Sequence, residues 1–254
     1  MSSDAGVFQK IRMVITLIYL LFLLPLLVIG MAILMIVSLG KLQDFLTRWV
    51  GHILGRSTMA VAGVRMDIRY YGPKPKEPAI FLMNHSSTLD LFIIISLHLP
   101  RVRFIAKKEL LYNPFFWAIA RMTGQIMIDR RDARKALKQL NEAYRHIRKN
   151  RLSIMFAPEG TRSETGKIMS FKPGAFLTAI ELGYPVVPIF IEGAYELCPG
   201  KSLITRPGTV TVHIHEPIAT SDWNKNNIRA YREDIRRRYL EWNGEIVSQK
   251  VHSI

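Results

Sequence analysis

The sequence is organised around residues 79–90, AIFLMNHSSTLD, where an apolar run ends in a short polar segment. Residues 79–83 are wholly apolar, which is typical of a short buried strand. Residues 91–97 are again almost wholly apolar, and Ser87 or Thr88 is suited to be the N-cap of a helix leading into them. This stretch therefore predicts a strand, a polar turn and a helix in direct succession.

His85 and Asp90 lie in this turn, and α/β proteins usually bind their ligands at such strand ends. Imidazole exchanges protons near neutral pH, and a neighbouring carboxylate fixes its tautomer and stabilises the imidazolium. The five-residue spacing allows Asp90 to fold back onto the ring of His85. Two interpretations stay open here: a general-base dyad, or a polar turn whose aspartate caps the helix.

The rest of the chain alternates strands and helices, which predicts an α/β fold with a largely parallel sheet flanked by helices. The predicted strands span residues 64–71, 79–83, 101–106, 125–128, 152–156, 185–191 and 209–214. The predicted helices span residues 87–98, 131–150, 174–182 and 227–242.

An apolar segment precedes this domain. Residues 13–39 contain no charged side chain, and this run exceeds the roughly 20 residues that a helix needs to cross a bilayer core. Pro25 and Gly30 interrupt it, so we expect a kink or a break there. Basic residues flank both ends, which leaves open a single tilted span or a hairpin that enters one leaflet and returns. The symmetric flanks and the central Pro25 favour the hairpin.

Residues 42–61 carry apolar side chains at helical spacing and are predicted to form an amphipathic helix. This helix could rest on a membrane surface with Trp49 at head-group depth, or it could pack on the domain as a core-facing helix. We therefore divide the chain into a membrane anchor at residues 1–62 and a second domain at residues 63–254.

The composition points to anionic partners. The formal net charge is +15, with 35 Lys and Arg against 20 Asp and Glu, which suits lipid head groups, acidic proteins or phosphorylated molecules. We expect no nucleic-acid partner, because the basic residues are dispersed, no recognition motif occurs and the chain carries a membrane segment. Cys198 is the single cysteine, so no intrachain disulfide can form.

Three further blocks accompany the histidine and aspartate: GQIMIDR at residues 124–130, FAPEGTRS at 156–163 and YPVVPI at 184–189. This ordered set closely resembles the glycerolipid acyltransferase family, the lysophosphatidate acyltransferases in particular, over about residues 68–216. Ala157 is a departure, because the family more often has Phe directly before Pro; no catalytic residue depends on it.

The resemblance implies transfer of a fatty acyl group from acyl-CoA or acyl carrier protein to the free hydroxyl of 1-acyl-glycerol-3-phosphate, giving phosphatidate. It implies His85 as the general base and Asp90 as the residue that orients it. The chain has no Gly-x-Ser-x-Gly elbow, so no acyl-enzyme is expected. Backbone amides near the His85 turn or near Gly160 are both candidates for stabilising the oxyanion.

The resemblance also implies an acceptor site, whose cations would bind the phosphate of the acceptor. Glu159 would hold a cation or an acceptor hydroxyl, and Gly160 would allow close backbone approach. For Lys107 and Arg130, a solvated surface charge is the alternative. The candidate acceptor-binding residues are Lys107, Arg130, Glu159, Gly160, Thr161 and Arg162.

Two histidines near the end of the chain, His213 and His215, alternate on a predicted strand and could suggest a metal site. No third ligand accompanies them at a recognisable spacing, so we predict no metal and no cofactor. The donors are cytosolic, so we expect the active site on the cytoplasmic face of a membrane, the inner membrane if the protein is bacterial.

Other functions remain open at this point. The acceptor could be a different lyso-lipid, the chain could be a membrane-bound lipid hydrolase or thioesterase, or it could bind lipid without catalysis. The absent serine elbow argues against the hydrolase.

Overall fold

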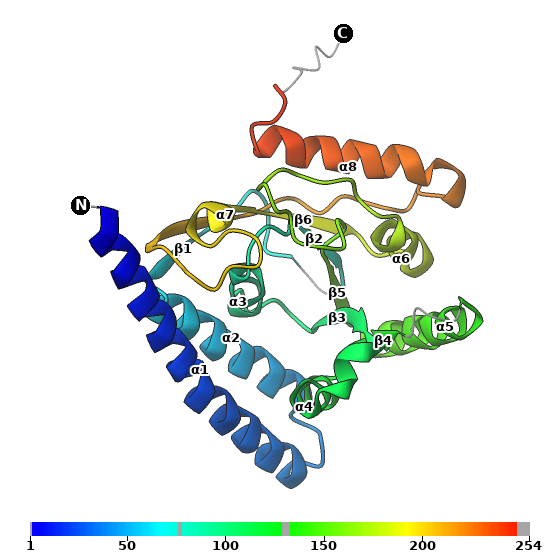
Figure 1. The fold of residues 1–254 in the computed structure, drawn as a ribbon. Helices are drawn as coiled ribbons and strands as arrows, with labels where there is room; N and C mark the ends of the chain where they lie inside the picture. The colour runs from blue at the N-terminus through cyan, green and yellow to red at the C-terminus, as the bar shows by residue number, and fades with distance from the viewer. Residues whose placement is uncertain (1, 76–77, 129–132, 248–254) are drawn as a thin grey trace.

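The computed structural model describes residues 2–75, 78–128 and 133–247, and its centre is one seven-stranded sheet (Figure 1). The strands lie in the order β1-β7-β6-β2-β5-β3-β4. Five of them, from β6 to β4, are parallel, whereas β7 is antiparallel to β6 and parallel to β1. The strands are β1 (Val64–Tyr70), β2 (Ile80–Met83), β3 (Val102–Lys107), β4 (Ile126–Ile128), β5 (Ser153–Phe156), β6 (Val186–Glu192) and β7 (Gly208–Ile214). The predicted α/β fold with a largely parallel sheet is confirmed.

Helices cover both faces of this sheet (Figure 1). α2 (Gln43–Val61) and α3 (Leu89–Ser96) pack on one face, and α5 (Ala133–Asn150), α6 (Gly174–Leu182) and α8 (Ile228–Trp242) pack on the other. β2 lies at the centre, and its alternating side chains divide between the two cores, with Phe81 in one and Leu82 in the other. Both side chains are fully buried.

Shorter helices complete the fold. The aromatic segment after β3 forms α4, which was not among the predicted helices. These elements are η1 (Lys108–Tyr112), α4 (Pro114–Thr123), α7 (Ala194–Leu197) and η2 (Lys225–Asn227).

α1 (Ser2–Val37) is one continuous helix that runs through Pro25 and Gly30. The helix is not broken between residues 13 and 37, so neither a break nor the hairpin favoured for this segment is formed. The chain reverses instead at residues 38–42, so that α1 and α2 lie side by side (Figure 1). Proline removes one backbone hydrogen bond from a helix, but opening a turn in apolar surroundings would leave several polar groups unpaired. Continuing the helix is therefore the less costly solution.

The surface of α1 is apolar and open. Phe22 is 72 % exposed and Leu26 is 67 % exposed, although neither has a polar group to hydrate. Among the described residues, one helix is long and apolar enough to cross a bilayer, Gly6–Val37. An apolar surface of this extent marks a site of interaction with lipid or protein.

α2 has one face buried against the domain, as expected for a core-facing helix, and one exposed apolar face. Met59 is buried in the core, and Gly55 touches the α3 backbone so closely that a Cβ atom there would lie 2.4 Å from the Phe92 carbonyl oxygen. On the other face, Phe45 and Trp49 are about half exposed, at 56 % and 46 %. α2 is thus a core-facing helix that also extends the apolar surface of α1.

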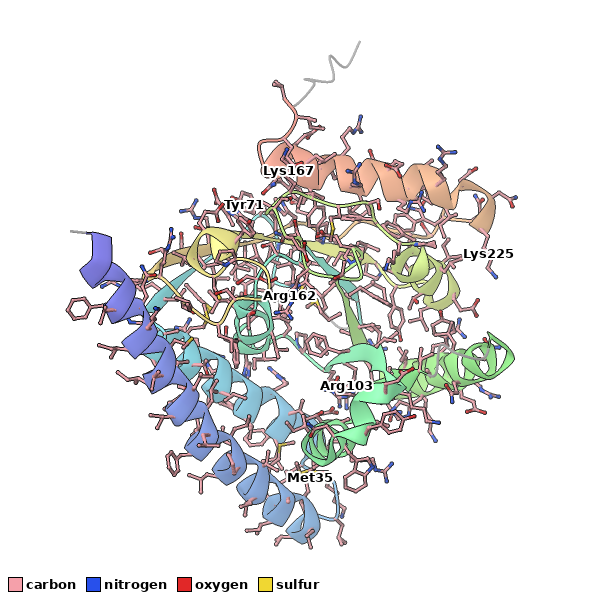
Figure 2. The ribbon with its side chains drawn as sticks, in the orientation of Figure 1. Met35, Tyr71, Arg103, Arg162, Lys167 and Lys225 are labelled. Carbon is pink, nitrogen blue, oxygen red and sulfur yellow. The ribbon has the colours of Figure 1, made fainter. Side chains whose placement is uncertain are left out.

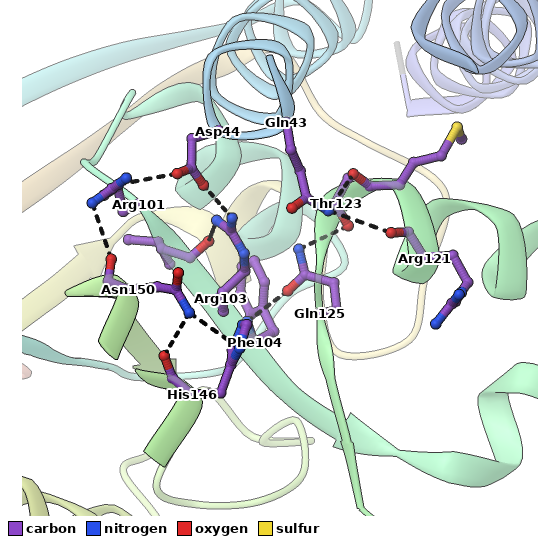
Figure 3. A network of polar contacts seen from close by, with 12 residues as sticks. Gln43, Asp44, Arg101, Arg103, Phe104, Arg121, Thr123, Gln125, His146 and Asn150 are labelled. Atoms are coloured by element: carbon purple, nitrogen blue, oxygen red, sulfur yellow. Dashed lines mark hydrogen bonds and ion pairs between the residues drawn. The ribbon is translucent and has the colours of Figure 1, made fainter. Parts of the chain in front are cut away.

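A polar network attaches the start of α2 to the sheet (Figure 3). Asp44 pairs with Arg103 of β3, which is 3 % exposed, and with Arg101 through a 3.0 Å bond to its Nε. Burial alone would raise the pKa of Asp44, but its hydrogen bonds and attraction to both arginines outweigh burial and lower that pKa. The neighbouring Gln43 donates to the Met122 carbonyl of α4 at 3.0 Å. The start of α2 is therefore joined to the sheet by a partly buried cluster of ion pairs.

Candidate active site

The predicted pair of His85 and Asp90 is formed. His85 Nδ1 lies 2.7 Å from Asp90 Oδ2, and the side chains are 25 % and 1 % exposed. Because a carboxylate accepts, this bond assigns the proton to Nδ1 and leaves Nε2 as the basic nitrogen. The arrangement has what a general base requires: an ordered tautomer and partial access to solvent.

Asp90 also organises the backbone around it. Its Oδ2 accepts the amides of Ser86 at 2.8 Å and Ser87 at 2.9 Å. Thr88 occupies the N-cap position, but the hydroxyl that accepts the Leu89 amide, at 3.1 Å, is that of Ser87. Asp90 therefore pairs with the histidine and also closes the turn, whereas the side chain that bonds the first amide of the helix belongs to Ser87 and not to the aspartate. We call residues 84–90 the His85 turn.

Glu159 lies beneath the His85 turn. It is 3 % exposed, its Oε1 accepts the amide of His85 at 2.9 Å, and its Oε2 accepts the amide of Met169 at 3.2 Å. Burial raises the pKa of Glu159 to about 7, although both hydrogen bonds and the charge of His85 oppose this rise. The sequence suggested contact with a cation or an acceptor hydroxyl; this position instead suits holding the His85 backbone in place.

Arg162 lies beside α3 (Figure 2). Its Nη1 donates to Thr88 Oγ1 at 2.7 Å and to the Gly200 carbonyl at 3.4 Å. The adjacent Ser163 donates its amide to the carbonyl of His85 at 2.8 Å. The blocks around residues 85 and 162, far apart in the sequence, therefore form one structure at the carboxyl ends of neighbouring strands.

Gly160 and Thr161 are exposed at the surface of this site. Gly160 has a φ of +76°, and a Cβ atom there would lie 2.6 Å from Lys172 Nζ. Lys172 therefore adds a cation beside the EGTR segment. Sequence reasoning missed it because it lies ten residues further along, just before α6, where a lysine is unremarkable.

The side chains of two predicted acceptor-binding residues, Lys107 and Arg130, are not described by the structure. Lys107 ends β3, whose carboxyl end is at the same edge of the sheet as the His85 turn, but its side chain is outside the described part of the structure. Arg130 lies outside the described residues altogether.

His213 and His215 are both engaged by neighbouring side chains, and each ring lies against Tyr71. His213 bonds Tyr71 through Nδ1 at 2.8 Å and Glu192 through Nε2 at 2.9 Å. His215 stacks on Trp242 at 3.7 Å, and burial lowers its pKa to about 4, helped by His213 and Arg238. Within the described ranges, no group of three potential ligands is placed to hold a metal.

Comparison with known proteins places this geometry in a family. The model of the acyltransferase family matches residues 66–192. The 1-acyl-sn-glycerol-3-phosphate acyltransferase of Cocos nucifera is 34 % identical over 192 residues, which are 75 % of this chain and 62 % of the relative. The chain thus spans less than two thirds of that plant protein.

Bacterial relatives are matched over more of their length. The protein of the same name from Haemophilus influenzae is 32 % identical over 206 residues, 78 % of this chain and 82 % of the relative. The crystal structure of the 1-acyl-sn-glycerophosphate acyltransferase PlsC from Thermotoga maritima superposes with a TM-score of 0.73 at 27 % identity, covering 95 % of this chain and all of that one. This chain belongs to the acyltransferase family.

Proposed function

We propose that this protein is a membrane-bound O-acyltransferase that acylates the free hydroxyl of 1-acyl-glycerol-3-phosphate to give phosphatidate. The observation that carries the proposal is the 2.7 Å pair of His85 and Asp90, fixed beside Arg162 in a single site. The names of relatives from plants, yeast and bacteria support the acceptor.

His85 would act as the general base. Its Nε2 removes the proton of the acceptor hydroxyl while the hydroxyl oxygen attacks the thioester carbonyl. Asp90 keeps the proton of the neutral ring on Nδ1 and stabilises the imidazolium that forms. The tetrahedral intermediate then collapses to the new ester and a thiolate, and the imidazolium returns its proton to the thiolate. His85 thus takes one proton from the hydroxyl and returns it to the leaving thiolate, so the step balances without an acyl-enzyme or a cofactor.

The oxyanion of the intermediate needs donors that are not already engaged. The amides of residues 85–87 are bonded to the carboxylates of Glu159 and Asp90, and the amide of Gly160 is bonded to the Ala157 carbonyl. In the part of the chain that the structure describes, the amides of Thr161 and Arg162 have no partner. We therefore assign these two donors to the oxyanion.

The acceptor phosphate would bind Arg162. Only Nη1 of this guanidinium is engaged within the described residues, which leaves further donors in the planar fork for phosphate oxygens. Lys172 lies close enough to Gly160 to contribute a second positive charge. Lys107 and Arg130 remain proposed contributors, on the strength of the family resemblance.

The acyl donor would be acyl-CoA or acidic acyl carrier protein, for which the net charge of +15 is suited. α1 and the exposed face of α2 would insert into the bilayer, with Trp49 near the head groups. Because these donors are cytosolic, the His85 turn would face the cytoplasm, at the inner membrane if the source is bacterial.

An acyl-transfer assay tests this function. Purified full-length protein in mixed micelles is incubated with a labelled acyl thioester, with and without lysophosphatidate and with a panel of other lyso-lipids. Label in phosphatidate is the expected result. Label found mainly in another product lipid would mean that a different lyso-lipid is the acceptor. Label in free fatty acid, with or without lysophosphatidate, would identify a hydrolase. An unchanged thioester would contradict the proposal that the protein is an enzyme acting on these substrates.

A further inference from the structure

We propose that the loop of residues 198–206 lines the acceptor site beside the His85 turn and the EGTR segment, and that Leu203 and Ile204 at its tip contact the acyl chain that the acceptor already carries. This inference rests on the proposed function and adds a specificity-determining element to it. The sequence gives no hint of this contact, because the loop lies more than a hundred residues from the His85 turn.

The loop is bonded directly to the His85 turn. Ser87 Oγ donates to the Cys198 carbonyl at 2.6 Å, and the Gly200 amide donates to the Ser86 carbonyl at 2.9 Å. Ser87 and Pro199 also form an isolated antiparallel bridge. These bonds hold the first part of the loop against Ser86 and Ser87, the two residues that follow the proposed base His85.

The same loop fixes the proposed phosphate ligand. The Gly200 carbonyl accepts from Arg162 Nη1 and from Thr88 Oγ1, both at 3.4 Å. A loop that fixes Arg162, the proposed ligand of the acceptor phosphate, must also lie close to the rest of the acceptor.

The tip of the loop has a fixed shape of its own. The Ser202 amide donates to the Pro199 carbonyl at 2.9 Å, and the buried Cys198 donates its Sγ proton to the Ser202 carbonyl at 3.2 Å. The Ile204 amide donates to Ser202 Oγ at 3.0 Å, and the Arg206 amide closes the loop on Leu197. These bonds fix the course of the loop backbone, and its tip presents side chains.

Those side chains are apolar. Leu203 is 52 % exposed and Ile204 is 36 % exposed, adjacent in the chain. Leu203 is three residues from Gly200, so it lies within about 10 Å of the bonded segment. Leu91, three residues beyond Thr88 on α3, is also exposed, at 50 %. Single exposed leucines need no explanation, but neighbouring ones beside a polar site do.

The geometry of the acceptor indicates what these side chains meet. In 1-acyl-glycerol-3-phosphate, the carbon that carries the ester is bonded to the carbon that carries the reacting hydroxyl. With the hydroxyl at His85 and the phosphate at Arg162, the acyl chain must leave the site within a few bond lengths of the His85 turn. The exposed ion pair of Lys201 and Glu164 at the base of the loop opposes immersion of the loop in hydrocarbon. These observations favour the acyl chain of the acceptor over the bilayer as the partner of Leu203 and Ile204.

The test compares Leu203→Ser, Ile204→Ser and the double variant with Leu177→Ser, a matched control on α6 whose leucine is 37 % exposed on the other face of the sheet. For each full-length protein, kcat and KM are measured for lysophosphatidate with a long acyl chain and with a short, water-soluble one. Thermal midpoints and binding to phosphatidylglycerol-containing vesicles are measured in parallel.

We expect KM for the long-chain acceptor to rise about 5- to 20-fold in the double variant, as for the loss of apolar contact in a pocket. KM for the short-chain acceptor, kcat, vesicle binding and the thermal midpoint should match the control. An equal rise for both chain lengths, an unchanged long-chain KM, or a loss of vesicle binding would overturn the inference. A wild-type protein that acylates neither acceptor would instead refute the proposed function, and the inference with it.

Discussion

The His85 turn and the exposed face of α1 and α2 are built in opposite ways. In the turn, two buried carboxylates, Asp90 and Glu159, accept four hydrogen bonds between them from residues 85–87, so its geometry is fixed by polar contacts. On α1, the exposed side chains beyond Lys10 are apolar, and what they contact must come from outside the chain. No hydrogen bond described for the His85 turn or for Arg162 involves a side chain of α1 or α2. The comparison predicts that chemistry and location are separable: on the proposed function, the turn carries out the reaction and the helices determine where it occurs.

The largest effect should come from His85→Ala. Without the base, kcat should fall about 10²- to 10⁴-fold, while vesicle binding and the thermal midpoint stay near wild type. His146→Ala, which alters an exposed histidine of α5, is the control and should retain full activity. Near-wild-type turnover by the His85 variant in the acyl-transfer assay would reject the dyad, and a parallel loss of membrane binding would reject the separation of the two regions.

A smaller effect is expected for Arg162→Ala. KM for lysophosphatidate should rise about 10- to 100-fold, because hydrogen bonds to a charged group contribute about 1.5–3 kcal/mol. Arg162→Lys should recover only part of this loss, since an ammonium lacks the bidentate fork. Arg229→Ala on the surface of α8 is the matched control. If KM for lysophosphatidate is unchanged in the Arg162 variant, the phosphate is bound elsewhere.

The exposed apolar face of α1 is tested by the double variant Phe22→Asp and Leu26→Asp. An acidic residue at the centre of a membrane helix costs roughly 3 kcal/mol, so the protein retained in sedimented membranes should drop about 10-fold or more. In detergent with a short-chain acceptor, kcat should stay within about two-fold of wild type, because the site lies in the sheet domain. Leu177→Asp serves as the control. Full retention in membranes would mean that α1 is not the anchor.

A change in stability, not in activity, is expected for Glu159, whose folded-state pKa is raised from 4.5 to about 7. A raised acid pKa means that the folded protein binds the proton more tightly than the unfolded chain does. The free energy of unfolding should therefore fall as pH rises from about 4.5 to 7, by up to roughly 3 kcal/mol from this group, and then level off. His85, Asp90 and Tyr239 face the same carboxylate, so the pH dependence is measured as the difference between wild type and Glu159→Gln. Parallel unfolding profiles for the two proteins would show that Glu159 does not titrate in this range.

Much of this molecule is predictable from its sequence, for reasons visible in particular elements. β2 and α3 follow from the switch between a buried strand pattern and a capped apolar run, and α6 was predicted at its observed limits. The proximity of His85 and Asp90 follows from a five-residue spacing at a turn. These are local features, and local sequence determines them.

What was not predictable depends on contacts between distant segments. Nothing near Glu159 in the sequence indicates that its carboxylate is buried and bonded to the His85 amide, 74 residues away. The 198–206 loop, Lys172 beside Gly160 and the antiparallel placement of β7 are likewise set by tertiary packing. Pro25 misled in the opposite sense, because α1 continues as a helix through this local helix breaker within an apolar segment.

The tautomer of His85 tests the account most directly. Nitrogen NMR of the full-length protein labelled at histidine, with the His85 signals assigned by their loss in His85→Gln, reports which ring nitrogen carries the proton in the neutral form. The structure predicts a proton on Nδ1, bonded to Asp90, and a bare Nε2. A neutral ring protonated on Nε2 would contradict the proposed base, because that nitrogen could not then accept the proton of the acceptor hydroxyl.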